Sequence, residues 1–166
     1  IENGVTQPST ILEEVNKLVV NSFGNTEDAI RDGMDMGICS WNKKTNTLQY
    51  AGACHSLLIH DGEELSEVKG DRESIGDSFL DQIPKFTNHV ININPNTTFY
   101  LSSDGFPDQF GGVKGKKYKY SSFRKTLLSN YTLPMEEQKQ ILSKEFDFWK
   151  GDLEQIDDVC LIGVRI

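Results

Sequence analysis

The stretch that decides the fold is Leu101-Ser102-Ser103-Asp104-Gly105-Phe106-Pro107-Asp108-Gln109-Phe110-Gly111-Gly112. It continues the apolar and aromatic run Thr98 to Leu101, which predicts a β-strand, and its Asp104-Gly105 pair is typical of a turn. An acidic pair, Asp157-Asp158, stands at the start of the apolar run Val159 to Ile166, which predicts a central strand covered on both faces. The Asp104-Gly105 turn and this acidic pair therefore each mark one end of a strand.

Strand ends of this kind can converge at one edge of a sheet. Carboxylates held close together repel each other unless a cation lies between them, and hard oxygen ligands suit Mg²⁺ or Mn²⁺. Asp104 and Asp157 are thus candidate metal ligands, and Gly105 permits a tight turn beside Asp104. Taken singly, each pair also has a plain structural interpretation, as an ordinary turn or as the cap of a loop.

The flanking sequence predicts a mixed α and β domain. Apolar spacing from Thr10 predicts an amphipathic helix, with Thr10 and Glu13 as a capping box. β-branched and aromatic runs bounded by turn residues predict an antiparallel meander followed by a hairpin. The strands of the meander are Met34 to Trp41, Thr47 to Ala53 and Leu57 to Ile59, and those of the hairpin are Val90 to Ile93 and Thr98 to Leu101; two later helices are expected at Ser122 to Asn130 and Pro134 to Lys150.

Length and composition set further bounds. The 166 residues fit one domain, and the formal charge of -8 argues against nucleic acid as a partner. No apolar run approaches the roughly 20 residues needed to cross a bilayer. The cysteines Cys39, Cys54 and Cys160 form no CxxC pair, so we expect reduced, buried thiols and a cytoplasmic location, which leaves open whether a parent protein is anchored to a membrane.

Several segments, in unbroken order from about Pro8 to Ile166, together resemble one enzyme family. They are Asp32-Gly33-Met34-Asp35, Tyr50-Ala51-Gly52-Ala53, Ser74-Ile75-Gly76, the stretch from Leu101 to Gly112, and Gln155-Ile156-Asp157-Asp158-Val159-Cys160-Leu161-Ile162-Gly163-Val164. This combination resembles the metal-dependent type 2C (PPM) serine/threonine protein phosphatases, and most closely their bacterial stage II sporulation protein E-like branch. The resemblance implies an α+β fold, a four-layer αββα sandwich with two central antiparallel sheets.

The resemblance also implies roles for particular residues. Asp104 matches the aspartate of the family's Ser-Asp-Gly motif, and Asp157 matches the aspartate before its final strand; both are metal ligands in the family. Gly105 supports the turn at Asp104. Asp35, Asp108 and Asp158 are secondary candidates, for which a site role and a plain structural role stay open.

The implied reaction is hydrolysis of phosphoserine or phosphothreonine by a metal-activated water, with a Mn²⁺ or Mg²⁺ pair in the complete domain. The implied partners are a phosphorylated protein substrate, such as an anti-sigma-factor antagonist, and an upstream sensor or regulatory domain. Because family members often dimerise, a homodimer is one expected assembly. The alternative function is a non-catalytic phosphatase-like module that binds or scaffolds a phosphoprotein.

One family element is not found in the sequence. The Asp-x-x-Gly-His-Gly motif, whose aspartate bridges both metals, should precede the opening helix, and none of the early acidic residues lies in such a setting. We therefore expect residues 1–166 to be the C-terminal two-thirds of a single phosphatase domain whose N-terminal portion is missing. A fragment of this kind should bind metal poorly and show low activity.

Two other features have competing interpretations. His55 could serve as a general acid, but a single histidine on a strand is more often a structural residue. A basic and aromatic loop follows the Asp104 motif and could grip a phosphoprotein or a regulatory partner, although charge runs more often solvate a surface. This loop contains Lys114, Lys116, Lys117, Tyr118, Lys119 and Tyr120.

Overall fold

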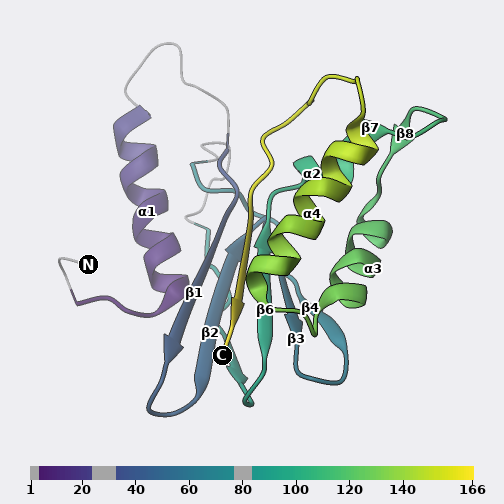
Figure 1. Cartoon of the computed structure of the whole chain (residues 1–166). Helices are drawn as coiled ribbons and strands as arrows, with labels where there is room; N and C mark the ends of the chain where they lie inside the picture. The colour runs from purple at the N-terminus through teal and green to yellow at the C-terminus, as the bar shows by residue number, and fades with distance from the viewer. Residues whose placement is uncertain (1–3, 24–32, 77–83) are drawn as a thin grey trace. The chain divides into compact units, whose positions relative to one another are not determined.

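A computed structural model describes residues 4–23, 33–76 and 84–166 (Figure 1). The chain divides into two compact units, each built from two segments. Unit 1 contains Ile1–Leu57 and Glu67–Pro95, and unit 2 contains Leu58–Ser66 and Asn96–Ile166. Each unit combines helix with antiparallel sheet.

Unit 1 places one helix on a small sheet. Helix α1 (Pro8–Phe23) packs against strands β1 (Met36–Asn42) and β2 (Thr47–Ala53), and β5 (His89–Asn92) completes the order β1-β2-β5. Both pairings are antiparallel. The apolar face of α1 contributes Leu12 to a core formed with residues of the sheet and of the segments beside it, namely Ala51, Ala53, Ile75 and Phe86. Burial of this apolar surface holds the helix on the sheet.

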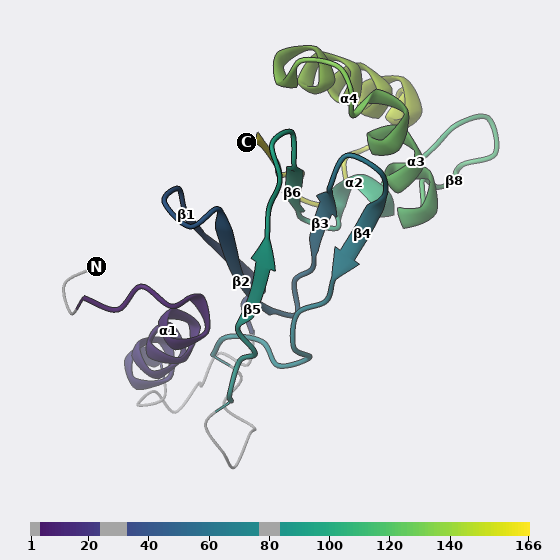
Figure 2. The ribbon, with the colours of Figure 1, turned by 90° about the horizontal axis from the view of Figure 1, so that it is seen from below.

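Unit 2 contains most of the sheet that positions the Asp104 and Asp157 segments. Its strands are β3 (Leu57–His60), β4 (Leu65–Val68), β6 (Thr98–Ser102) and β9 (Leu161–Arg165), in the order β4-β3-β6-β9. Helices α3 (Tyr120–Asn130) and α4 (Met135–Lys150) lie on one side of β3, β4 and β6 (Figure 2). Between β6 and α3 come the short helix α2 (Gly105–Asp108) and the hairpin of β7 (Phe110–Gly111) and β8 (Lys116–Lys117).

An aromatic cluster forms the centre of the unit 2 core. The ring of Phe106, in α2, lies 5.1 Å from that of Tyr118, 5.2 Å from that of Phe123 and 5.1 Å from that of Phe146. Tilted and edge-on ring contacts of this kind add to the stabilisation from burial. Because Phe106 follows Asp104 by two residues, the core fixes the start of the acidic segment.

The predicted meander is confirmed for its first two strands, because β1 and β2 pair antiparallel, but its third strand and the predicted hairpin are wrong. Strand β3 does not continue the sheet of β1 and β2, because it pairs with β4 and β6. Cys54 adopts a positive φ of 49° between β2 and β3 and helps to turn the chain out of the first sheet. Strands β5 and β6 likewise belong to different sheets, and Asn96, with a φ of 74°, lies in the connection between them.

Three further expectations are wrong. Helix α1 begins at Pro8, whose fixed φ suits a first helical position, so Thr10 lies inside the helix and forms no capping box. Strand β9 is an edge strand among the described strands, and its Ile162 is 54% exposed. Cys54 and Cys160 are exposed thiols, while Cys39 is partly buried, and all three are free.

Candidate metal site at the ends of β6 and β9

The two predicted strand ends converge. Strands β6 and β9 are antiparallel, with Ser102 opposite Leu161, so the end of β6 adjoins the start of β9. The pairing extends one step further, because the Ser103 amide donates to the Cys160 carbonyl at 2.9 Å. The antiparallel register thus brings the Asp104 and Asp157 segments to the same edge of the sheet.

Ser103 and Gly105 set the spacing of these two segments. The Ser103 hydroxyl donates to the Asp158 carbonyl at 2.8 Å and accepts from the Cys160 amide at 2.9 Å. Gly105 lies so near that a Cβ built on it would stand 2.4 Å from the Asp158 carbonyl oxygen. Only glycine permits this approach, which is a different requirement from the tight turn that the sequence predicted beside Asp104.

The side chains of Asp104 and Asp157 are exposed. Asp104 is the N-cap residue of α2, but its carboxylate makes no capping hydrogen bond. One carboxylate oxygen of Asp157, Oδ1, accepts the Asp158 amide at 2.7 Å. Both side chains therefore present carboxylate oxygen to solvent at the shared edge.

The secondary candidates are distributed over both units. Asp108 forms an ion pair of 2.8 Å with Lys117, so its carboxylate anchors the β7–β8 hairpin. Asp158 is joined to the site through its backbone carbonyl, while its side chain is exposed. Asp35 lies in unit 1, where it accepts a hydrogen bond of 3.2 Å from the Ser74 hydroxyl.

His55 lies in the connection after β2 rather than on a strand. Its carbonyl accepts a hydrogen bond from the Tyr50 hydroxyl, and in the part of the chain that the structure describes its buried Nδ1 has no hydrogen-bond partner. His60 is a buried core residue whose ring stacks on Tyr131 at 3.8 Å. Burial lowers the pKa of His60, with Arg165 acting in the same direction and Asp61 against it.

The basic and aromatic loop divides into a buried anchor and an exposed hairpin. Tyr118 is only 5% exposed, and its hydroxyl forms hydrogen bonds with Thr126 at 2.6 Å and Glu145 at 3.1 Å. Burial raises the pKa of this phenol. The lysines are exposed, so Tyr118 belongs to the core and not to a surface patch with them.

Gln109 is a residue of this site that sequence reasoning gave no role. Its side chain is fully buried, and its Nε2 donates to the Glu154 carbonyl at 2.9 Å and to the Phe110 carbonyl at 3.0 Å. Its Oε1 accepts from the Ile156 amide at 3.4 Å. Gln109 thereby holds the residues that directly precede Asp157, a contact that nothing in the local sequence signals.

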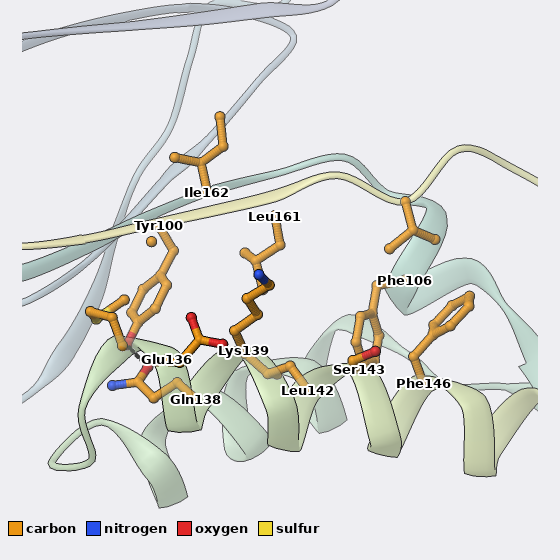
Figure 3. A pocket seen from close by; sticks show the side chains of 13 residues that line it. Tyr100, Phe106, Glu136, Gln138, Lys139, Leu142, Ser143, Phe146, Leu161 and Ile162 are labelled. Atoms are coloured by element: carbon orange, nitrogen blue, oxygen red, sulfur yellow. Dashed lines mark hydrogen bonds between the residues drawn. The ribbon is translucent and has the colours of Figure 1, made fainter.

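Unit 2 also contains a cavity of about 520 Å³ (Figure 3). It lies between α4 and strands β6 and β9, and its lining is mainly apolar, with Tyr100, Phe106, Leu142 and Phe146 among the residues. None of the aspartates predicted as site residues lines it. The cavity is therefore not the predicted metal site.

The donor chemistry at the shared edge fits a divalent cation, because carboxylate and carbonyl oxygens are the ligands that Mg²⁺ and Mn²⁺ prefer. The close approach at Gly105 brings a backbone carbonyl, that of Asp158, into the same small region. Within residues 4–23, 33–76 and 84–166, however, no three His, Cys, Asp or Glu side chains gather closely enough to hold a metal.

Comparison with known proteins places this geometry in a family. The SiaA-PP2C domain of Pseudomonas aeruginosa is 31% identical with a TM-score of 0.88, over 99% of this chain and 63% of that one. The phosphatase domain of the cell fate determinant SpoIIE from Bacillus subtilis, presoaked with Mn, is 16% identical with a TM-score of 0.56, over 95% and 72%. RsbX in complex with magnesium is 12% identical with a TM-score of 0.56, over 93% and 72%.

These likenesses define the fold as that of the PP2C-type phosphatase domains, which confirms the predicted α+β fold class. The family model for Stage II sporulation protein E (SpoIIE) matches residues 2–166, so the chain belongs to the SpoIIE family. The chain spans 63% of the length of the SiaA-PP2C domain. No curated protein matches it, and among the described residues no helix is long and apolar enough to cross a membrane.

Proposed function

We propose that the chain forms the larger part of a metal-dependent protein serine/threonine phosphatase domain, with Asp104 and Asp157 as metal ligands. The observation that carries the proposal is the pairing of β6 with β9, which brings these two carboxylate-bearing segments together in a chain of the SpoIIE family. Gly105 supports the arrangement because it lets the Asp104 turn approach the Asp158 carbonyl.

Mn²⁺ or Mg²⁺ is the proposed cofactor. The oxygen donors favour these ions, and the solved structures of RsbX with magnesium and of SpoIIE presoaked with Mn describe relatives that were studied with them. When bound, the metal supplies a water of lowered pKa and neutralises charge on the phosphate. Asp104 and Asp157 would hold it, and Ser103 would keep their segments in register.

The proposed substrate is a phosphorylated regulatory protein, of the type represented by an anti-sigma-factor antagonist. A formal charge of -8 disfavours nucleic acid as an alternative partner. Regulation by an upstream sensor domain, a cytoplasmic location and a homodimeric assembly belong to the same proposal. They rest on the family resemblance.

A second candidate is a non-catalytic phosphatase-like module that binds a phosphoprotein. The observation in its favour is that the described residues gather no cluster of three metal-ligating side chains. A module of this kind would bind its phosphoprotein without hydrolysing it, and removal of divalent cations would leave that binding unchanged.

Hydrolysis of a phosphoserine peptide and of p-nitrophenyl phosphate with added Mn²⁺ distinguishes the two candidates. It should be measured for this chain and for the native protein in which it occurs. Asp104→Asn should reduce the rate by about 100-fold or more, because a lost ligand forfeits several kcal/mol of charge stabilisation. Asp147→Asn, at an exposed position of α4, is the matched control and should leave the rate unchanged. If native protein and chain are both inactive with metal, the binding module is the better description.

A further inference from the structure

The segment that carries Asp157 has little burial of its own. Every residue from 151 to 158 is exposed, between the end of α4 at Lys150 and the start of β9 at Leu161. A segment without buried apolar contacts opens at low free-energy cost unless hydrogen bonds hold it. The position of Asp157 therefore depends on the few polar contacts that tie this segment to the rest of unit 2.

Two side chains from the Asp104 segment make these contacts on either side of Asp157. Ser103 binds the residues that follow Asp157, through the Asp158 carbonyl at 2.8 Å and the Cys160 amide at 2.9 Å. Gln109 binds the residues that precede it, through the Glu154 carbonyl at 2.9 Å and the Ile156 amide at 3.4 Å. The side chains of Ser103 and Gln109 thus bracket Asp157.

Gln109 is itself held firmly. Its side chain has no exposed surface, and its backbone carbonyl accepts from the Trp149 indole at 3.0 Å and from the Tyr118 amide at 3.0 Å. Hydrogen bonds made by a buried amide are costly to break, because a buried partner would be left unsatisfied. Gln109 can therefore impose its position on the exposed segment, rather than follow that segment.

We propose that Gln109 is a positioning residue of the metal site, which holds residues 154–156 so that Asp157 stands beside Asp104. The inference rests on the proposed function and assigns a determinant of metal affinity outside the ligands. It differs from a general packing role, because the hydrogen bonds of Gln109 end on the exposed segment that leads into Asp157.

The chain offers a closely matched control in Gln138. This glutamine is 1% exposed and accepts from the Tyr100 hydroxyl at 2.8 Å (Figure 3). Its Nε2 donates to the Tyr131 and Leu133 carbonyls at 3.1 and 2.9 Å, in the connection between α3 and α4. Gln138 therefore resembles Gln109 in burial and in the number of its side-chain hydrogen bonds, but its contacts do not involve the Asp157 segment.

The test compares Gln109→Met with Gln138→Met in the native protein and in this chain. Both variants should lower the midpoint of thermal unfolding without metal, because both lose buried hydrogen bonds. Mn²⁺ binding, followed by the electron paramagnetic resonance of the free ion, should weaken by about tenfold in Gln109→Met and stay at the wild-type value in Gln138→Met. Phosphatase activity of Gln109→Met should be recovered at saturating Mn²⁺.

Hydrogen exchange of the metal-free protein gives an independent readout. Peptides covering residues 152–158 should exchange faster in Gln109→Met than in Gln138→Met or the wild type. Unchanged exchange, or equal loss of Mn²⁺ affinity in both variants, overturns the positioning role. If the wild type neither binds Mn²⁺ nor hydrolyses phosphate esters, the proposed function fails, and the role of Gln109 toward a metal fails with it. If the wild type does both and Gln109→Met matches it, only the positioning role fails.

Discussion

Gly105→Ala is the sharpest perturbation of the proposed site. Gly105 opens α2, where alanine is a better helix former, so local propensity alone makes the substitution favourable. The added Cβ would stand 2.4 Å from the Asp158 carbonyl oxygen, about 1 Å short of ordinary van der Waals contact. Both groups are backbone or attached directly to it, so the Asp104 and Asp158 segments must separate to relieve the contact.

Overpacking of this kind costs about 1–3 kcal/mol of folding stability, and each kcal/mol lowers the midpoint of thermal unfolding by about 2–4 °C in a domain of this size. A displacement of about 1 Å between reacting groups can also reduce the rate by about 100-fold. We therefore expect Gly105→Ala to lose far more activity than stability. Differential scanning fluorimetry and Mn²⁺-dependent hydrolysis of p-nitrophenyl phosphate measure the two effects.

Gly163→Ala provides the comparison, because its Cβ would meet the mobile Cε of Met135 at 2.6 Å and the Tyr100 ring at 3.2 Å. Side chains can move aside more easily than backbone, so this variant should be closer to the wild type in both assays. The reasoning is refuted if Gly105→Ala unfolds at the wild-type temperature and retains wild-type activity and Mn²⁺ affinity.

Three other predictions concern stability and reactivity. Because burial lowers the pKa of His60, and its Nδ1 accepts the Gly62 amide at 3.1 Å, the folded state holds a neutral imidazole. Below about pH 6.5 the unfolded chain therefore binds one more proton than the folded chain, and the free energy of unfolding should fall as the pH is lowered through that range. In urea unfolding, this fall with pH should be smaller for His60→Gln than for the wild type, and an equal fall would contradict a neutral His60. Phe123→Ala should lower the free energy of unfolding by about 3–5 kcal/mol, since Phe123 is fully buried against Phe106. Leu128→Ala, at a 45% exposed position, should lower it little, and similar urea midpoints for the two variants would show that Phe123 is not a core residue. Burial raises the pKa of the Cys39 thiol to about 12, so Ellman's reagent at pH 8 should label exposed Cys54 and Cys160 quickly and Cys39 only after unfolding. Rapid labelling of all three thiols in the folded protein would contradict this prediction.

Helices were predictable because their signals are local. The sequence predicted a helix at Pro134 to Lys150, and α4 spans Met135–Lys150. The expected Ser122 to Asn130 corresponds to α3, which begins two residues earlier at Tyr120. Contacts within one or two turns decide such elements, so the nearby residues contain the needed information.

Strand pairing was not predictable in the same way. The runs at β2 and β3 and at β5 and β6 were recognised as strands, but each pair was assigned to one sheet when its members belong to two. A strand pattern reports which face is buried and does not name the partner strand. The backbone turns at Cys54 and Asn96 redirect the chain; Cys54 is not a residue type that signals a positive φ, and an asparagine turn does not identify the partner strand.

In the candidate site, too, residues in local motifs were predictable from the sequence and residues with distant partners were not. Asp104, Gly105 and Asp157 were predicted from the strand-end motifs and from the resemblance, and the roles of the two aspartates as metal ligands remain predictions. Asp108 was a secondary candidate, and its ion pair with Lys117 provides a structural reason for its charge. Gln109 was quoted within the motif but given no role, because its hydrogen-bond partners lie about 45 residues away.

The sequence by itself determined the α+β class, the family, most helices and strands, and the two strand-end motifs at Asp104 and Asp157. These features depend on local periodicity and short motifs, which the order of residues contains directly. Only the tertiary structure decided the order β4-β3-β6-β9, the close approach of Gly105 to Asp158, and the bracketing of Asp157 by Ser103 and Gln109. Those features require hydrogen bonds and burial between distant segments, which form only when the whole chain has folded.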